Sequence, residues 1–282
     1  MEIQTIGVVG AGAMGNGIAQ VCAQAGYAVI MHDREDAFVQ RGLGTIQKSL
    51  GKLAEKGRFS PAERDAIYAR VTPSTTLADL AVAQLVIEAV FEKLDVKRDV
   101  LGRLDSLCPP ETILASNTSS ISITKLAAAT QRPDRVIGMH FFNPVPIMQL
   151  IEIIRALQTS QATFDTIRVL SVRLGKTPVA VQDSPGFVTN RVLMPLLNEA
   201  MFAYMEGIAS AEDIDTAVRL GLNHPMGPLT LADYVGLDVC LDVLEVLHRE
   251  LGDPKFRPCP LLRKMVDAGY LGRKSGQGFY TY

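Results

Sequence analysis

The stretch TIGVVGAGAMG, residues 5–15, decides the fold of this chain. Its apolar part, Ile6–Val9, is typical of a buried β-strand, and the glycines that follow match the pattern GxGxxG. Ile18, Val21 and Cys22 then recur at helical spacing. The glycines therefore lie between a strand and a helix, which is the context that a dinucleotide-binding turn requires.

Each position of this turn has a physical task. Gly10 permits the tight turn, Gly12 lets a pyrophosphate approach the backbone, and Gly15 allows close packing of helix on strand. Ala13 and Met14 begin the helix, where free amide N–H groups and the positive end of the helix dipole favour phosphates. The alternative is a glycine-rich turn that binds no ligand.

A second predicted strand, Tyr27–His32, ends at Asp33. An acid about 20 residues after the glycines should hydrogen-bond the adenosine ribose and repel the 2′-phosphate of NADP. Arg34 opposes this preference, because its guanidinium can pair with such a phosphate. The sequence therefore predicts NAD as the cofactor and disfavours NADP.

The whole chain has the composition of a globular protein. It has 282 residues, of which 48% are apolar and 21% charged, with a net charge of −2. This excludes a mainly disordered chain and gives no electrostatic reason to expect nucleic acid or a membrane as partner. The four cysteines lack zinc-like spacing, so we expect no metal site and a reducing compartment. Without a membrane span or a leader segment, we expect the cytoplasm.

Strand-like and helix-like stretches alternate up to residue 183, which predicts an α/β domain over residues 1–183. We expect a Rossmann-type, mostly parallel sheet with helices on both faces. The predicted strands are Ile3–Val9, Tyr27–His32, Leu85–Val90, Thr112–Ala115, Val136–His140, Leu150–Ile154 and Thr177–Val181. The predicted helices are Met14–Ala25, Ala37–Lys56, Lys93–Leu107, Ser122–Ala129 and Thr163–Leu174.

Strand signals nearly vanish after Val181. Ser184-Pro185 is a candidate helix start. Ser210 and Asp213 resemble a capping box, and Gly221 lies near the end of the helix that they would begin. Residues 229–251 form another amphipathic stretch. We therefore expect an all-α domain over residues 184–282.

Two polar segments follow predicted strands, at the edge of the sheet where ligands bind in this class of fold. Glu92 and Lys97 are candidate cofactor contacts, although a solvated first helical turn with Glu–Lys pairing explains them as well. The run SNTSS, residues 116–120, brings hydroxyls and an amide to the crevice. Its alternative is a turn that supplies the next helix with an N-cap.

His140 ends one apolar strand, and Glu152 is the acid of the next one. A lone histidine in such a strand is often a core residue, but an unpaired buried carboxylate is costly and needs a partner. A short turn between the strands would bring the two together. Imidazole could then take the hydroxyl proton of an alcohol during hydride transfer, while the carboxylate fixes its tautomer. From spacing alone the pairing is a hypothesis.

Five motifs together resemble the short-chain L-3-hydroxyacyl-CoA dehydrogenases, and the resemblance spans nearly the whole chain. They are GAGAMGNGIA at 10–19, SNTSS at 116–120, GMHFFNPVP at 138–146, DSPGFVTNR at 183–191 and GRKSGQGFY at 272–280. The resemblance implies an NAD-dependent oxidoreductase that interconverts an L-3-hydroxyacyl-CoA, such as (S)-3-hydroxybutyryl-CoA, and the 3-ketoacyl-CoA, such as acetoacetyl-CoA. The alternatives are a related dehydrogenase of a sugar acid such as L-gulonate and a nucleotide-binding structural protein.

The same resemblance assigns roles to residues. It implies that His140 is the general acid/base, Glu152 its orienting partner, Ser119 the hydroxyl that binds the substrate's 3-oxygen, and Asn190 the amide that positions the substrate. The implied NAD contacts are Gly10, Gly12, Ala13, Met14, Gly15, Asp33, Glu92, Lys97, Ser119, Asn143 and Lys274.

Coenzyme A contacts and a homodimer are also implied by the resemblance. Ser49 and Lys56, together with Ser119 and Asn190, match positions that contact the substrate. A basic cluster around Lys56 suits phosphates, but a solvated helix face would look the same. The homodimer would form through the second domain, where core packing explains the candidate interface residues equally well; these are Met201, Tyr204, Tyr234 and Leu237.

Overall fold

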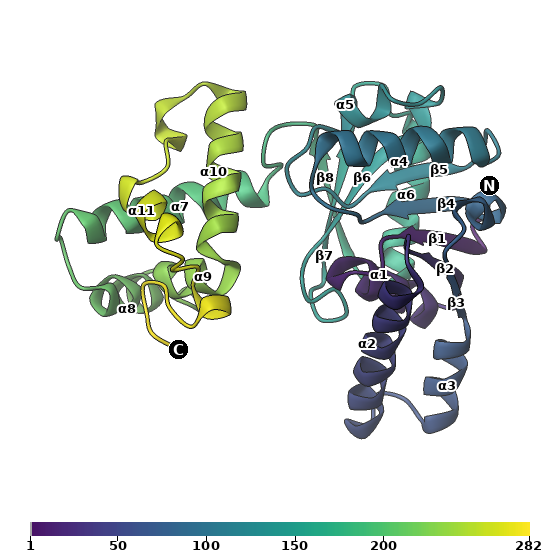
Figure 1. Ribbon diagram of the computed structural model, residues 1–282, viewed down its shortest axis with the longest axis horizontal. Coiled ribbons are helices and arrows are strands. Elements are labelled where there is room, and N and C mark those ends of the chain that lie inside the picture. The colour runs from purple at the N-terminus through teal and green to yellow at the C-terminus, as the bar shows by residue number, and fades with distance from the viewer. Residues whose placement is uncertain (1) are drawn as a thin grey trace. The chain divides into compact units, whose positions relative to one another are not determined.

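The computed structural model describes residues 2–282 and divides into two compact units. The first unit ends at Ser184 and the second begins at Pro185, and Figure 1 labels the elements of both. Among the described residues, no helix is both long and apolar enough to span a membrane.

An eight-stranded sheet forms the centre of the first unit, in the order β3-β2-β1-β4-β5-β6-β7-β8. Strands β6 and β7 pair antiparallel, and the other neighbours pair parallel. The prediction of a mostly parallel sheet is confirmed. The strands are β1 (Thr5–Val9), β2 (Ala28–His32), β3 (Val71–Ser74), β4 (Leu85–Glu88), β5 (Ile113–Ser116), β6 (Val136–Phe141), β7 (Leu150–Arg155) and β8 (Thr177–Gln182).

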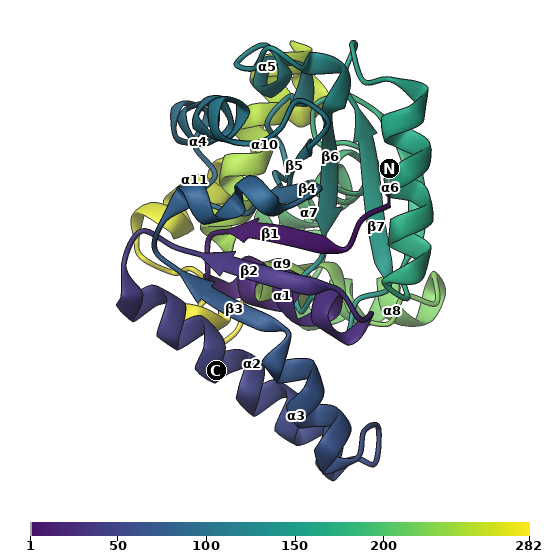
Figure 2. The same ribbon diagram turned by 90° about the vertical axis from the view of Figure 1, so that its right-hand side faces the viewer.

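Helices cover both faces of this sheet, as Figure 2 shows for α4 and α6. Leu85 and Ile87 of β4 belong to the apolar core that contains side chains of α1, α2 and α6. Val86 lies between them and points to the opposite face, because side chains alternate along a strand. The helices are α1 (Ala13–Gln24), α2 (Asp36–Glu55), α3 (Pro61–Ala69), α4 (Leu94–Leu107), α5 (Ile123–Ala127) and α6 (Gln161–Arg173).

One α-helix and one strand of the first unit are absent from the sequence prediction, as are the short 3₁₀ helices η1 (Leu77–Val82) and η2 (Pro133–Arg135). Helix α3 begins with a capping box between Ser60 and Glu63 and has Pro61 in its first turn. It leads into β3, a short strand at the edge of the sheet that contains Pro73. Proline is tolerated there because an edge strand has one side without a partner.

The strand order changes direction at β1, because β2 and β3 lie on one side of it and β4 on the other. In open parallel sheets, ligands bind beyond the carboxyl ends of the strands at such a point. Gly10 comes directly after β1, so the fold brings the glycine turn to this position.

The described residues 185–282 of the second unit form helices and short turns with two isolated β-bridges, which confirms the predicted all-α domain. Met201 and Leu237 belong to its apolar core, so core packing accounts for them, whereas Tyr204 and Tyr234 are exposed. The elements are α7 (Thr189–Met205), α8 (Ala211–Gly221), α9 (Pro228–Val235), α10 (Leu237–Leu251), η3 (Pro254–Phe256), α11 (Pro260–Asp267) and η4 (Arg273–Ser275).

The structure refines the sequence pattern at two places in the second unit. Ser184-Pro185 does not start a helix, because Gly186 (φ 74°) and Phe187 (φ 52°) have left-handed backbone and α7 begins at Thr189. The stretch 229–251 is not one helix, because Gly236 (φ 105°) separates α9 from α10. A positive φ interrupts a right-handed helix, and glycine adopts it without steric cost. The predicted cap at Ser210 is confirmed, since its side chain accepts the N–H of Asp213.

Candidate active site

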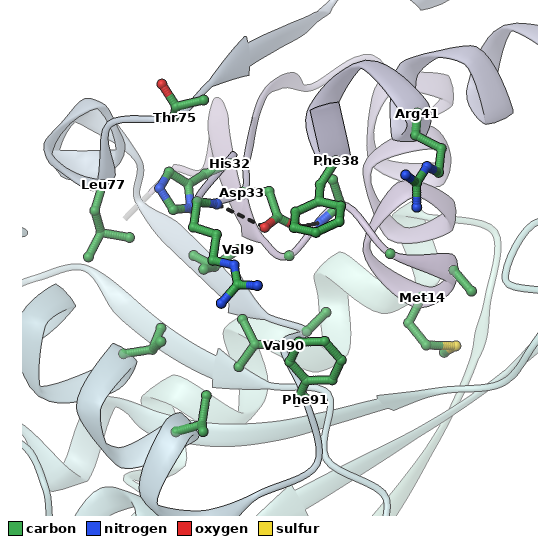
Figure 3. Close-up of a pocket in the computed structure, with 18 of the residues that line it drawn as sticks. Val9, Met14, His32, Asp33, Phe38, Arg41, Thr75, Leu77, Val90 and Phe91 are labelled. Atoms are coloured by element: carbon green, nitrogen blue, oxygen red, sulfur yellow. Dashed lines mark hydrogen bonds between the residues drawn. The ribbon is translucent and has the colours of Figure 1, made fainter. Parts of the chain in front are cut away.

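A cavity of about 690 Å³ lies at the glycine turn. Figure 3 shows Asp33 and Phe38 on one side of it, with Val90 and Phe91 across from them. Five of the predicted NAD contacts line this cavity: Gly10, Gly12, Ala13, Met14 and Asp33.

The three glycines of the turn differ in what surrounds them. A Cβ on Gly10 would lie 2.6 Å from the carbonyl oxygen of Ala89, and one on Gly15 would lie 1.7 Å from the carbonyl oxygen of Gly10. Among the described residues, no heavy atom would lie within 4 Å of a Cβ on Gly12. Gly10 and Gly15 are thus required by the protein's own packing, whereas Gly12 keeps the cavity wall open. That arrangement fits a pyrophosphate lying against Gly12 at the N-terminus of α1.

The carboxylate of Asp33 is fixed by two backbone N–H groups. Oδ2 accepts from Ala11 and Oδ1 from Arg34, each at 2.8 Å. The first bond ties the end of β2 to the glycine turn. The carboxylate therefore has a set position at the cavity, as hydrogen bonding to a ribose requires.

Two arginines lie beside Asp33 at the same cavity. The guanidinium carbons of Arg34 and Arg41 are each 5.6 Å from the centre of the Phe38 ring, and all three residues line the cavity. Sequence reasoning missed Phe38 and Arg41, because nothing distinguishes them from other residues of an amphipathic helix.

Lys97 is 1% exposed, so a solvated helical turn is the wrong interpretation of this residue. Its Nζ lies 2.8 Å from Glu88 Oε1 and 3.2 Å from Glu92 Oε2. Glu88 is fully buried and also accepts hydrogen bonds from the Val90 N–H and the Ser116 hydroxyl. Sequence reasoning missed Glu88, and neither Glu92 nor Lys97 lines the cavity.

Glu92 connects this buried pair to the SNTSS turn. Its Oε1 accepts from the Thr118 hydroxyl at 2.5 Å and from the Ser119 N–H and hydroxyl at 2.8 and 3.2 Å. Burial by itself raises the pKa of Glu92, but the Lys97 ammonium and these donors together hold it below its usual value. Glu92 is therefore an ionised acceptor that fixes Ser119. The cap of α5 is Ser122, so no residue of 116–120 is needed for that purpose.

The predicted contact between His140 and Glu152 is present. The two residues are direct partners in the antiparallel ladder of β6 and β7, and His140 Nδ1 lies 2.8 Å from Glu152 Oε2. His140 is 7% and Glu152 1% exposed. Because an ionised carboxylate accepts hydrogen bonds and does not donate them, Nδ1 carries the proton in this pair. The other ring nitrogen, Nε2, is then the basic one.

The SNTSS turn is tied to the strand of the histidine. The side-chain oxygen of Asn117 accepts the N–H of Phe141 at 2.9 Å. Phe141 directly follows His140, so this bond fixes the turn that carries Ser119 beside the end of β6.

The remaining predicted site residues of the first unit are Asn143, Ser49 and Lys56. Asn143 is exposed in the turn after β6 and does not line the cavity. Ser49 is half-buried on α2, and Lys56 is the exposed residue at the C-terminus of that helix.

Asn190 and Lys274 belong to the second unit. Asn190 lies in the first turn of α7, and Lys274 lies in η4, where its Nζ is 2.5 Å from Asp238 Oδ2. The first unit by itself thus brings together the glycine turn with Asp33, Ser119 with Glu92, and His140 with Glu152.

Comparisons with known proteins agree along the chain. Residues 5–184 match the family model "3-hydroxyacyl-CoA dehydrogenase, NAD binding domain", and residues 186–282 match "3-hydroxyacyl-CoA dehydrogenase, C-terminal domain". A probable 3-hydroxybutyryl-CoA dehydrogenase of Deinococcus radiodurans is 56% identical over 276 residues, which cover 98% of this chain and 99% of the relative. A 3-hydroxybutyryl-CoA dehydrogenase of Clostridioides difficile is 50% identical over 277 residues, with 98% and 99% covered.

A solved structure is similarly close. The (S)-3-hydroxybutyryl-CoA dehydrogenase of Ralstonia eutropha superposes with a TM-score of 0.98 at 54% identity, covering 100% of this chain and 99% of that one. The two family models match in order along residues 5–184 and 186–282, and the His140–Glu152 contact and the glycine turn lie within the first of these ranges. The chain belongs to the 3-hydroxyacyl-CoA dehydrogenase family.

Proposed function

We propose that this protein is an NAD-dependent dehydrogenase that interconverts (S)-3-hydroxybutyryl-CoA and acetoacetyl-CoA. The observation that carries the proposal is the buried hydrogen bond between His140 Nδ1 and Glu152 Oε2, in the same sheet that positions the glycine turn. The printed names of the relatives support a four-carbon acyl-CoA as substrate.

In this proposal His140 moves the proton. When bound, NAD⁺ would supply the hydride acceptor for C3 of the substrate. His140 takes the hydroxyl proton on Nε2 as the alcohol is oxidised, and returns it to the oxygen in the reverse direction. Glu152 holds the imidazole in the tautomer with the proton on Nδ1 and stabilises the imidazolium that forms.

Ser119 and Asn190 act on the substrate oxygens in this proposal. The Ser119 hydroxyl binds the 3-oxygen, and the Glu92 carboxylate supports it in that position. Asn190, from the first turn of α7, positions the substrate. Ser49 and Lys56 of α2, together with these two residues, contact coenzyme A; the exposure of Lys56 leaves its ammonium available for phosphate.

We propose NAD as the cofactor because the Asp33 carboxylate, fixed by the Ala11 N–H, accepts ribose hydroxyls and repels a 2′-phosphate. Gly10, Gly12, Ala13, Met14 and Gly15 form its pyrophosphate site. Asn143 and Lys274 contact it, together with Ser119. The burial of Lys97 favours a role through Glu88 and Glu92.

The two alternatives carry less support. A sugar-acid dehydrogenase of the same fold is not favoured, because the names of the matched family models and of the similar relatives refer to hydroxyacyl-CoA substrates. A nucleotide-binding structural protein has no need of a His–Glu pair buried in a strand ladder.

The direct test is spectrophotometric. The purified protein should oxidise NADH when acetoacetyl-CoA is added, and L-gulonate with NAD⁺ should give no turnover. Charge repulsion at Asp33 should make kcat/KM for NADPH at least about tenfold lower than for NADH. A protein that binds NADH but turns over neither class of substrate would contradict the proposal.

Removing the base should reduce turnover without unfolding the protein. We expect His140→Ala to lower kcat by about 10²–10⁴-fold, which is typical of a lost general acid/base. Glu152→Gln should also lower kcat, since a glutamine amide can donate to Nδ1 and favour the wrong tautomer. His248→Ala, on α10, is the matched control. Unchanged kinetics of His140→Ala would exclude this histidine from the reaction.

The glycines should separate stability from cofactor binding. Gly15→Ala forces a Cβ against the Gly10 carbonyl oxygen and should lower the melting temperature strongly. Gly12→Ala meets no described atom, and its φ of −64° suits alanine, so the variant should fold normally. Its Cβ would occupy the space for the pyrophosphate, and we expect the Kd for NADH to rise at least about tenfold. Equal NADH binding by Gly12→Ala and the parent protein would show that the cofactor lies elsewhere.

We propose further that the second unit forms a homodimer. Several of its apolar side chains are exposed, and burial between two copies would remove them from water; they include Val192, Ile208, Leu220 and Leu222. Light scattering should give twice the mass of one chain, and Ile208→Asp should shift the measured mass toward that of a single chain. A parent protein with the mass of one chain would contradict this.

A further inference from the structure

Lys176 is a buried lysine that the proposed reaction does not use. It directly precedes β8 and is 8% exposed. Its Nζ donates to the carbonyl oxygens of Val145 at 2.5 Å and Met148 at 2.7 Å. In the described part of the chain it has no carboxylate within ion-pair distance, and burial lowers the pKa of its ammonium. A buried cation is costly unless it is hydrogen-bonded, so breaking these two bonds would leave the buried ammonium without acceptors.

The two carbonyls belong to one turn, residues 143–149, which joins β6 to β7. His140 lies before this turn and Glu152 after it. Within the turn, the N–H groups of Ile147 and Met148 both donate to the Pro144 carbonyl, at 2.9 and 3.0 Å. The Lys176 ammonium therefore donates to two carbonyl oxygens of a turn that is already closed by its own backbone hydrogen bonds.

Helix α1 contacts the turn from another side. A Cβ on Gly17 would lie 2.8 Å from the Val145 Cβ and 3.5 Å from the Pro146 Cδ. Gly17 lies one helical turn after Ala13, so the turn packs directly on the helix whose N-terminus closes the dinucleotide cavity. Val145 is 2% exposed between these two contacts.

We infer that Lys176 is a positioning residue that holds turn 143–149 against helix α1 at Gly17. It thereby sets where Asn143 lies relative to the glycine turn. The inference rests on the proposed function only in that Asn143 is taken as a cofactor contact. His140 itself is held by the strand ladder and by Glu152, so loss of the ammonium should affect cofactor binding more than proton transfer.

The test removes the charge and keeps the apolar stem, with Lys176→Met in the full chain. Hydrogen exchange followed by mass spectrometry, without any ligand, should show the turn 143–149 exchanging at least about tenfold faster at the Ile147 and Met148 amides, which donate to the Pro144 carbonyl, because the turn loses two charge-assisted bonds. The Kd for NADH, measured by NADH fluorescence, should rise about three- to tenfold. KM for NADH should rise with it, while kcat at saturating NADH changes less than about twofold.

Three further variants make the result specific. Lys176→Arg keeps a cation with several donors and should restore much of the protection of the turn. Gly17→Ala displaces the same turn from the α1 side without touching the ammonium and should raise the Kd for NADH in the same way. Lys264→Met, an exposed lysine of α11, should change none of these quantities.

The inference is overturned if folded Lys176→Met exchanges normally at residues 143–149 and binds NADH like the parent protein. It is also overturned if exchange rises equally throughout the first unit, since that indicates a general loss of stability. If Lys176→Met fails to fold, Gly17→Ala decides: unchanged NADH binding would then reject the role of the turn. A protein inactive toward acetoacetyl-CoA would leave the exchange and NADH measurements valid, so failure of the proposed substrate remains distinguishable.

Discussion

The antiparallel pairing of β6 with β7 is the constraint on which the buried contact between His140 and Glu152 depends. An antiparallel neighbour can follow after a short turn, whereas a parallel one needs a long crossover, so consecutive strands can face each other residue by residue. The register sets His140 opposite Glu152. A slip of one residue would send one of the two side chains to the other face of the sheet and leave a carboxylate buried without its partner. The geometry of the pair is therefore fixed by folding, before any ligand binds.

A second buried pair fixes the crevice on the other side of the SNTSS turn. Replacing a buried ion pair by apolar residues is often neutral for stability, so a gain in folding stability does not explain why Lys97 and Glu88 are buried together. Their hydrogen bonds do: Glu88 accepts from Val90 N–H and from the Ser116 hydroxyl, and Lys97 also reaches Glu92. The pair thus joins the end of β4 to the end of β5 and to the residue that holds Ser119.

The sequence predicted those features that local patterns encode. The glycine turn, Asp33 and the mostly parallel sheet follow from strand and helix periodicity, and the buried acid at Glu152 required a partner on energetic grounds. Helix α3 and β3 were missed because a nine-residue helix and a four-residue strand with an internal proline give little periodicity. Gly236 was missed as a break because a glycine within an amphipathic pattern is compatible with a continuous helix until its φ is known.

The burial of charged groups is what local patterns do not encode. Lys97 and Lys176 look like surface lysines in the sequence, because the acceptors that each buried ammonium binds belong to other segments: Glu88 of β4 for Lys97, and the β6–β7 turn for Lys176. Both hold backbone or side chains of turns at the edges of the sheet, and Asp33 does the same for the glycine turn through Ala11. Such turns are usually the mobile parts of an α/β fold. A charge-assisted hydrogen bond contributes about 1.5–3 kcal/mol, which is enough to keep a turn in one arrangement. A ligand that binds there then loses less conformational entropy, because the turns are already ordered.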